Sequence, residues 1–187
     1  MDSYLKELLD TLNKIEIKLQ VFGDTFSYDE GVDKLIDVFL QKKRTNKSIA
    51  FIGNGGSAAI AIHMTSDFLK NGKMKTISFY NPATLTCLGN DYSYDEVFSK
   101  QIDSIMREGD MLIAISSSGM SSNIVRAIEC AHAKNVDVIS FTGFDESNTS
   151  RVKSDISLYV PCHKYGIVES IHNLILQEIV DKIIEFG

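Results

Sequence analysis

The sequence predicts a single α/β domain in which a parallel sheet is covered by helices on both faces. Its 187 residues are enough to bury a core that folds as one domain. Short continuous apolar runs alternate with longer segments of helical periodicity, and such runs are typical of parallel strands buried on both faces. Residues 1–187 contain no internal repeat, linker or low-complexity segment, so we expect one domain over the whole chain.

The first 45 residues predict a helical extension of this domain. Leucine and isoleucine recur at i, i+3, i+4 and i+7 over residues 2–21, with charged residues between them, which predicts an amphipathic helix. A second amphipathic helix is predicted over residues 28–43, with Val32, Leu35 and Ile36 on its apolar side. The first helix carries a longer stripe of leucine side chains than packing against one face of the sheet would cover. We therefore expect residues 1–45 to pack on the domain or on neighbouring subunits.

The remaining chain predicts five strands, most of them separated by helices. The strands are predicted at residues 48–52, 76–79, 111–115, 136–141 and 156–160. The helices are predicted at residues 58–69, 94–106, 123–133 and 167–186. Ligands of such sheets lie beyond the carboxyl ends of the strands, near helix N-termini, so the loops that follow the strands are the expected functional positions.

Composition limits the kinds of partner. Lys and Arg number 19 against 25 Asp and Glu, a formal net charge of −6, which gives non-specific nucleic-acid binding no electrostatic support. No apolar run reaches the roughly 18 residues of a membrane span, and the N-terminus lacks a secretory pattern. The cysteines Cys87, Cys130 and Cys162 form no C-x-x-C motif and are expected to be reduced thiols. We expect a cytoplasmic protein with no nucleic-acid or membrane partner.

A glycine-rich loop, GNGGS at residues 53–57, lies between the first predicted parallel strand and a helix. Glycines allow positive φ and close approach of a ligand, and the helix start supplies unpaired N–H groups. Gly53, Gly55 and Ala58 also satisfy the G-x-G-x-x-[GA] pattern of dinucleotide-binding folds. The acidic residue expected after the next strand is missing, because residues 78–81 are SFYN, and there is no Walker A sequence. A nucleotide-dependent oxidoreductase is therefore disfavoured, no nucleotide cofactor is expected, and a tight turn without a ligand is the structural alternative.

A second loop, residues 116–123, contains five serines and an asparagine between a strand and a helix. One serine would serve as an N-cap, and five exceed that need. Several hydroxyls together with helix N–H groups offer neutral donors to a phosphate monoester, and the helix dipole adds a favourable field. The loop predicts a phosphate site, with a plain flexible turn as the alternative.

Three segments together resemble the phosphoheptose isomerase branch of the SIS (sugar isomerase) family. They are GNGGSAA at 53–59, GNDYSY at 89–94 and GDMLIAISSSG at 109–119, and the resemblance extends over nearly the whole chain. It implies a three-layer α/β SIS domain and a homotetramer whose sites combine residues from neighbouring subunits. It also implies that a sugar phosphate binds. The implied phosphate ligands are Ser57, Ser116, Ser118 and Ser121. The implied sugar contacts are Ser117, the backbone of Asn54, Gly55 and Gly56, and the side chains of Asn90 and Asp91, which would meet the sugar hydroxyls.

The predicted helices also carry groups suited to proton transfer. Ketose–aldose isomerisation moves a proton between adjacent carbons and needs a base, together with an acid or metal at the oxygens. His63 and Asp67 share a helix face at i, i+4. Glu169 and Gln177 lie within about 80° of each other on the closing helix, and a charge on so apolar a helix needs a partner or a function. We expect His172, on another side of that helix, to make a structural hydrogen bond.

The chain departs from the zinc-using members of the family at these positions. Those members carry His and Glu on the first helix and Gln and His on the last, which the resemblance matches to His63, Asp67, Glu169 and Gln177. Only His63 agrees. Gln177 cannot transfer a proton as an imidazole can. The implied metal ligands for Zn²⁺ or another divalent cation are these four residues, and the implied catalytic residues are Asp67, Glu169 and Gln177, with either carboxylate as the base.

The sequence thus favours a sugar-phosphate ketose–aldose isomerase that acts on sedoheptulose 7-phosphate or a related heptose or hexose phosphate. The alternative is a noncatalytic SIS protein that binds a sugar phosphate or another protein, because Gln177 lacks the imidazole of the family. The intact glycine and serine loops favour ligand binding in both cases.

Overall fold

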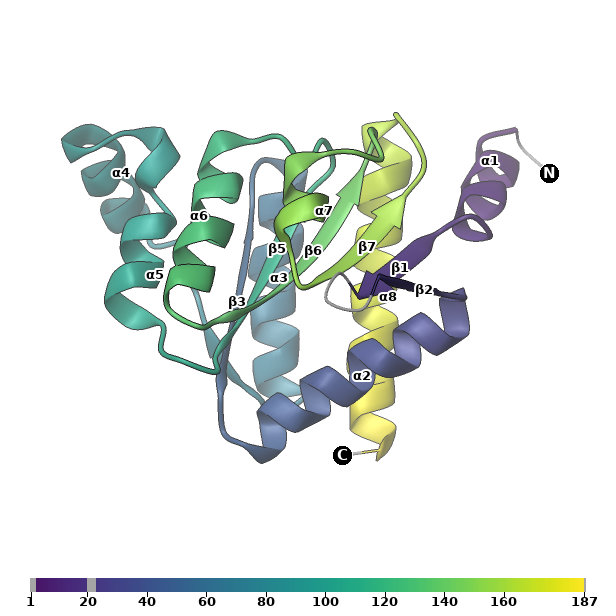
Figure 1. Ribbon diagram of the computed structural model, residues 1–187, viewed down its shortest axis with the longest axis horizontal. Coiled ribbons are helices and arrows are strands. Elements are labelled where there is room, and N and C mark those ends of the chain that lie inside the picture. Colours follow the sequence, from purple (N-terminus) through teal and green to yellow (C-terminus); the bar gives the residue numbers. More distant parts are fainter. Residues whose placement is uncertain (1–2, 20–22, 187) are drawn as a thin grey trace.

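The computed structural model describes residues 3–19 and 23–186, which form a three-layer α/β domain around one sheet (Figure 1). The sheet has seven strands in the order β2-β1-β7-β6-β5-β3-β4. The strands are β1 (Glu16–Leu19), β2 (Asp24–Phe26), β3 (Ser48–Gly53), β4 (Lys75–Ile77), β5 (Met111–Ser116), β6 (Asp137–Gly143) and β7 (Ile156–Val160). The helices are α1 (Ser3–Leu12), α2 (Tyr28–Arg44), α3 (Gly56–Lys70), α4 (Pro82–Asp91), the 3₁₀ helix η1 (Tyr94–Glu96), α5 (Ser99–Ile105), α6 (Ser122–Ala133), α7 (Thr149–Lys153) and α8 (Tyr165–Phe186).

The centre of the sheet is parallel, as predicted. Strands β4, β3, β5, β6 and β7 pair in parallel, and every residue of β3, β5 and β7 is buried. Along β5, Ile113 and Ile115 join the core cluster that includes residues of α2, α3 and α8. Leu112 and Ala114 face the opposite cluster, which includes residues of α5 and α6. Helices on both faces explain why these strands are continuous apolar runs.

The prediction of a single helix over residues 2–21 is wrong beyond Leu12. There α1 ends, and the chain forms β1, which pairs antiparallel with both β2 and β7. Ile15, Ile17 and Leu19 alternate with polar residues, a strand period that the helical reading overlooked. Pairing with β1 also covers the edge of β7, which would otherwise be exposed. Residues 2, 20 and 21 of the predicted helix lie outside the described residues.

Other predicted elements differ in extent. The helix predicted over residues 94–106 is divided into η1 and α5, because Val97 and Phe98 turn into the core between them. Two helices, α4 and α7, were not predicted. The first has a recognisable start, because Asn81 accepts a hydrogen bond from the backbone N–H of Thr84 and Pro82 occupies the first turn. The predicted helix at 28–43 is confirmed by α2.

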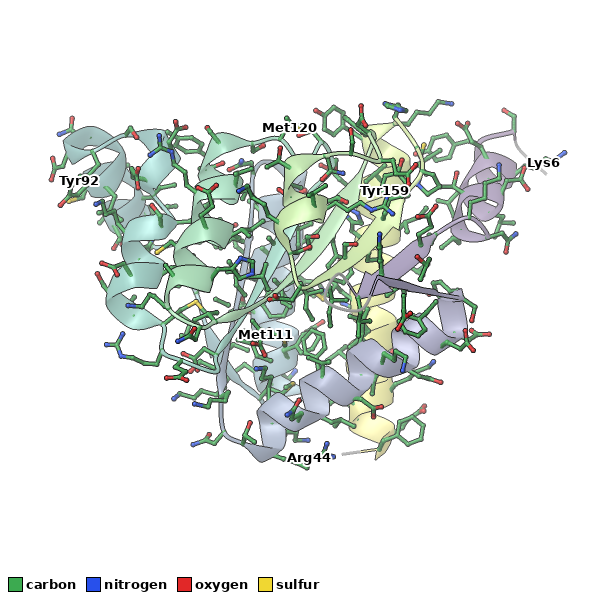
Figure 2. All side chains as sticks on the ribbon, viewed as in Figure 1. Lys6, Arg44, Tyr92, Met111, Met120 and Tyr159 are labelled. Atoms are coloured by element: carbon green, nitrogen blue, oxygen red, sulfur yellow. The ribbon has the colours of Figure 1, made fainter. Side chains whose placement is uncertain are left out.

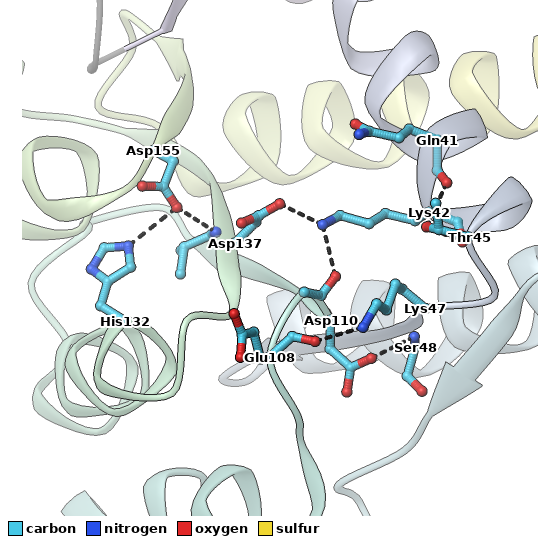
Figure 3. Close-up of polar contacts among 12 residues, drawn as sticks. Gln41, Lys42, Thr45, Lys47, Ser48, Glu108, Asp110, His132, Asp137 and Asp155 are labelled. Carbon is cyan, nitrogen blue, oxygen red and sulfur yellow. Dashed lines mark hydrogen bonds and ion pairs between the residues drawn. The ribbon is translucent and has the colours of Figure 1, made fainter.

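The amino ends of the strands are tied together by polar side chains (Figure 3). The buried side chain of Lys42 on α2 donates to the carbonyl of Gly109 (2.8 Å) and pairs with the carboxylate of Asp137. Asp110 accepts hydrogen bonds from the backbone N–H groups of Ser48 and Arg107, each at 2.8 Å. These bonds join α2, β3, β5 and β6 at one edge, so the polar groups there serve the fold.

Two further expectations can be compared with the structure. The three cysteines are unpaired, with Cys87 exposed and Cys162 buried. In residues 3–19 and 23–186, no helix is both long enough and apolar enough to cross a membrane.

The strand assignment of β1 can be tested at Ile17. This side chain is fully buried and packs against Gly31 of α2, where an added Cβ would lie 2.6 Å from the Cβ of Ile17. We expect Ile17→Ala to reduce the free energy of unfolding by about 2–5 kcal/mol. The neighbouring Lys18→Ala, on the opposite side of the strand, should change it by less than about 0.5 kcal/mol. Urea unfolding at one protein concentration measures both, and equal losses would contradict the assignment.

Candidate functional site

A small cavity of about 130 Å³ lies where the parallel strands end. Figure 2 marks this edge of the molecule, since Met111 begins β5 and Met120, just beyond its end, lies at the upper edge of the view. The cavity is lined by Asn54, Ser57, Ser116, Ser117, Ser118, Ser121, Tyr165 and Glu169. Seven of these eight residues were singled out from the sequence, and the fold brings them together from three separate segments. Tyr165 was missed.

The glycine loop has a conformation that requires glycine. A Cβ on Gly53 would lie 2.7 Å from the backbone of Ser57, so the strand turns into α3 with no room for a side chain. Gly55 has a φ of 57° and is the N-cap of α3, a backbone region that favours glycine. The hydroxyl of Tyr80 accepts a bond from the N–H of Gly53 (2.7 Å) and donates one to its carbonyl (2.8 Å). Burial raises the pKa of Tyr80, so the hydroxyl keeps its proton for this pairing.

Asn54 links this loop to the helices on its other side. Its side-chain amide exchanges two hydrogen bonds of 2.9 Å with the amide of Asn123, in the first turn of α6. Its oxygen also accepts a bond of 2.9 Å from the hydroxyl of Tyr94. The amide is therefore held within the protein, which fits the predicted role of the backbone, rather than the side chain, at this position.

The serine loop presents hydroxyls that the protein does not fully use. Ser121 is the N-cap of α6, yet its side chain makes no capping hydrogen bond. The hydroxyl of Ser117 is buried and has no partner, which costs about 1–3 kcal/mol when nothing compensates. Ser116, in contrast, accepts a bond from the N–H of Gly119 (3.2 Å) and shapes the turn. Unsatisfied hydroxyls beside a helix start are what an anion site requires.

The end of β6 and the segment that follows it hold the serine loop in place. The carbonyl of Ser117 accepts from the N–H of Gly143 (3.0 Å), and the carbonyl of Gly119 accepts from the N–H of Ser150 (2.9 Å). Gly119 has a φ of 62° and lies so close to Asn148 that a Cβ would be 1.9 Å from the amide oxygen. The loop is therefore anchored at both ends by backbone bonds to a neighbouring segment.

Glu169, on the second turn of α8, faces the start of α3. A Cβ on Gly56 would lie 2.3 Å from its Oε2, so the carboxylate occupies the space that glycine leaves. Partial burial raises the pKa of Glu169 above its usual range, because the charged form loses hydration. A carboxyl group with a raised pKa is better placed to exchange a proton near neutral pH than an exposed glutamate.

His63, Asp67 and Gln177 form a second polar group, between α3 and α8. These two helices pack against each other. Nε2 of Gln177 lies 3.0 Å from Nε2 of His63 and 2.9 Å from Oδ2 of Asp67, and the last two atoms are 3.3 Å apart. The structure thus brings together three of the four residues predicted as metal ligands.

Glu169, the fourth, lies elsewhere on α8. Eight residues separate it from Gln177, an axial rise of about 12 Å. Within the described residues, no group of three or more His, Cys, Asp or Glu is placed to hold a metal ion. The three atoms of the second group nevertheless have suitable spacing, because tetrahedral ligands about 2.1 Å from a zinc ion are roughly 3.4 Å apart. The amide of Gln177 would have to turn its oxygen inward, since its nitrogen is only a donor.

Asn90 and Asp91 lie outside the cavity of their own chain. Both are exposed at the end of α4, where the amide of Asn90 donates to Asp91 (3.0 Å) and the thiol of Cys87 contacts the same carboxylate (3.4 Å). In Figure 1, α4 lies at the side of the domain away from α8. A single copy of the chain does not bring these two residues to the serine loop.

His172 has the structural role that the sequence predicts. Its ring is fully buried, its Nε2 lies 3.1 Å from the carbonyl of Thr142, and it meets the ring of Phe141 edge to face. Burial lowers the pKa of His172 to about 4, so the imidazole is neutral. It contributes a hydrogen bond between α8 and β6.

Tyr165 could have been found from its spacing. It is the first residue of α8 and precedes Glu169 by four positions, which places both on one helix face. The side chain is 60% exposed although it lines the cavity. The sequence analysis did not select Tyr165, because an aromatic residue by itself does not indicate that a side chain lines a binding cavity.

Comparison with known proteins gives consistent similarities. The family model described as "SIS domain" matches residues 20–143. A phosphoheptose isomerase of Shewanella denitrificans is 33% identical over 162 residues, which cover 82% of this chain and 83% of that protein. The structure of a phosphoheptose isomerase from Neisseria gonorrhoeae matches with a TM-score of 0.82 at 29% identity, over 97% of this chain and 96% of the other. That of a phosphoheptose isomerase from Francisella tularensis matches with a TM-score of 0.84 at 26% identity, over 100% and 96%.

Proposed function

The chain belongs to the SIS domain family, in its phosphoheptose isomerase branch, and from this we propose that it is a sugar-phosphate isomerase. Its proposed substrate is a phosphorylated seven-carbon ketose such as sedoheptulose 7-phosphate, which it converts into the corresponding aldose. The observation that carries the proposal is the cavity at the serine loop, where hydroxyls from three segments converge beside a carboxylate.

The cavity suits a phosphate monoester. None of its lining residues is a lysine or arginine, so the donors are neutral hydroxyls and the backbone N–H groups at the starts of α3 and α6. Helix N-termini favour anions through both their unpaired N–H groups and their dipoles. The hydroxyl of Ser121 makes no capping bond, and the buried hydroxyl of Ser117 has no partner. Both could donate hydrogen bonds to phosphate oxygens.

The proton transfer is assigned to Asp67 and Glu169. In an isomerisation through an enediolate, a base removes the proton from one carbon and returns it to its neighbour. Glu169 borders the cavity, and Asp67 lies further along the same pair of helices. A sugar whose phosphate occupies the cavity can extend along α8 toward His63 and Asp67. Gln177 cannot transfer protons. Without a bound cation, its Nε2 donates the 2.9 Å hydrogen bond that orients Asp67.

We further propose that His63, Asp67 and Gln177 hold a divalent cation such as Zn²⁺. Their spacing supports this once the amide of Gln177 presents its oxygen. Glu169 is a further potential ligand from the sequence, although it lies two turns away on α8. A cation here would polarise the sugar's carbonyl and hydroxyl oxygens.

Assembly of several copies is also proposed, and a homotetramer is the state that the family resemblance implies. Exposed apolar side chains border the second polar group, with Ile62 next to His63 and Leu174 three residues before Gln177. Leu5 and Leu9 of α1 are exposed as well. A second copy that covered these residues would also offer a way for Asn90 and Asp91 to reach a neighbouring site.

Phosphate binding is tested at Ser118 and Ser121, whose hydroxyls are partly exposed. Ser116 is avoided because its hydroxyl supports the turn at Gly119. We expect the double variant Ser118→Ala, Ser121→Ala to weaken sugar-phosphate binding by at least about 1 kcal/mol for each lost hydrogen bond. Ser121 makes no capping bond, and the hydroxyl of Ser118 accepts only one long bond of 3.3 Å, from the exposed N–H of Met120, so the melting temperature should change little. Isothermal calorimetry measures the affinity.

The matched control is Ser122→Ala, one residue further on. Its hydroxyl bonds to Asp95 and does not line the cavity, so affinity should stay at the wild-type value. If the double variant also keeps the wild-type affinity, the assignment of the phosphate site is wrong. If the wild-type protein binds the sugar phosphate without turnover, the noncatalytic alternative is favoured.

The proton-transfer assignment predicts a large kinetic effect. Asp67→Asn and Glu169→Gln should each lower turnover at least about 100-fold, as expected for removal of a proton-transfer group. Gln177→His restores the family's imidazole and should raise the rate or leave it unchanged. A coupled assay under excess sugar phosphate, with and without added zinc, measures all four proteins, and activity should depend on the metal. Wild-type turnover that survives both carboxylate changes would refute the assignment.

The oligomeric state is measured by light scattering. At micromolar concentration we expect a mass that is a multiple of the chain mass of 20.8 kDa. Replacing Leu174 with Glu would put a charge among the exposed apolar residues of α8 and should shift the distribution toward smaller species. A wild-type mass of one chain would contradict the proposal.

A further inference from the structure

Tyr165, at the mouth of the serine-lined cavity, is part of an aromatic stack. Its ring meets that of Phe144 edge to face, with centroids 4.8 Å apart and planes at 73°. On its other side, Phe144 stacks on His163 with centroids 5.5 Å apart and planes at 23°. The tyrosine is 60% exposed, but its ring contacts Phe144, which in turn stacks on His163.

The support itself is firmly held. Phe144 has a φ of 58°, a backbone region that is unfavourable for a bulky residue and persists only where the surroundings impose it. Its N–H donates to the carbonyl of Cys162 (3.1 Å), and its carbonyl accepts from the hydroxyl of Tyr159 (2.9 Å). Tyr159, labelled in the upper right part of Figure 2, has the guanidinium of Arg151 over its ring, 4.2 Å from the centroid. The chain therefore maintains an unfavourable conformation in which Phe144 supports Tyr165.

The size of the cavity decides what Tyr165 can contact. Ligand pockets usually have volumes of about 300–1,000 Å³, and this one has about 130 Å³. It can enclose a phosphate group but not a whole sugar phosphate. The carbons next to the phosphate must then lie at the mouth, where the exposed Tyr165 lines the cavity one helical turn before Glu169.

We propose that the ring of Tyr165 packs against the carbon chain of the bound sugar phosphate, next to its phosphate group. The residue thereby contributes affinity for organic phosphate monoesters that inorganic phosphate does not gain. The apolar ring face is suited to C–H groups, and the support from Phe144 and His163 reduces the entropy lost on binding. This inference rests on the proposed function, because it takes the serine loop as the phosphate site.

The test compares two probes, inorganic phosphate and sedoheptulose 7-phosphate, by calorimetry and steady-state kinetics. Tyr165→Ala should weaken binding of the sugar phosphate about tenfold and leave the affinity for inorganic phosphate unchanged. KM should rise while kcat stays near the wild-type value, as expected for an interaction present in both ground and transition states. Tyr165→Phe keeps the ring and should behave as the wild type.

Two further variants separate this role from stability. Phe144→Gly removes the support without adding backbone strain and should raise KM in the same direction by a smaller factor. Phe186→Ala removes an aromatic ring that is 70% exposed at the opposite end of the same helix, and should leave both affinities unchanged. Thermal unfolding of each variant identifies any loss of the fold.

The outcomes distinguish the inference from the proposed function. If wild type binds both probes and Tyr165→Ala binds the sugar phosphate equally well, the inference is overturned and the phosphate site stands. If Tyr165→Ala weakens both probes by the same factor, the residue contacts only the phosphate and the inference is again overturned. If wild type binds neither probe, the proposed function and the inference fail together.

Discussion

A side chain at Gly53 would lie 2.7 Å from the backbone of Ser57, so β3 can turn directly into α3 only with glycine at that position. The start of α3 is thereby fixed at the carboxyl edge of the sheet. Gly56 then faces Glu169, and two to three turns further along α3, His63 and Asp67 reach Gln177. The positions of the serine-lined cavity and of the His63, Asp67 and Gln177 group therefore both depend on the close contact between Gly53 and Ser57. The hydroxyl of Tyr80 stabilises this turn by bonding to the N–H and the carbonyl of Gly53.

The electrostatics of the cavity differ from those of a cationic phosphate site. Its lining supplies hydroxyls and helix starts, and its one carboxylic acid is Glu169, whose pKa is already raised by burial. A phosphate dianion beside this carboxyl group would raise its pKa further through like-charge repulsion. Phosphate binding would therefore favour protonation of Glu169, and protonation of Glu169 would favour phosphate binding. A protonated carboxyl group can donate a hydrogen bond as well as accept one.

Polar side chains at the amino edge of the sheet stabilise the fold, whereas those at the carboxyl edge line the candidate site. At the amino edge, Lys42 and Asp110 have their hydrogen-bonding capacity directed at backbone groups and at Asp137, so this cluster closes the fold. At the carboxyl edge, the hydroxyls of Ser117 and Ser121 lack comparable partners. Among the described residues, buried side-chain atoms without a partner also occur at Thr142, Ser150 and His172, but only the hydroxyl of Ser117 lines the cavity, where a bound ligand could supply the missing hydrogen bond.

The sequence by itself determined the parallel sheet, the two loops and most of the cavity. Apolar runs and helical periodicity are local patterns, and a loop that follows a parallel strand must lie at the carboxyl edge, so Ser116 and Asn54 could be placed together in advance. Tertiary structure decided the rest. Strand β1 exists because β7, about 140 residues later, offers an unpaired edge. Likewise, Gln177 meets His63 while Glu169 meets Gly56, because the relative positions of α3 and α8 are set by packing between distant segments.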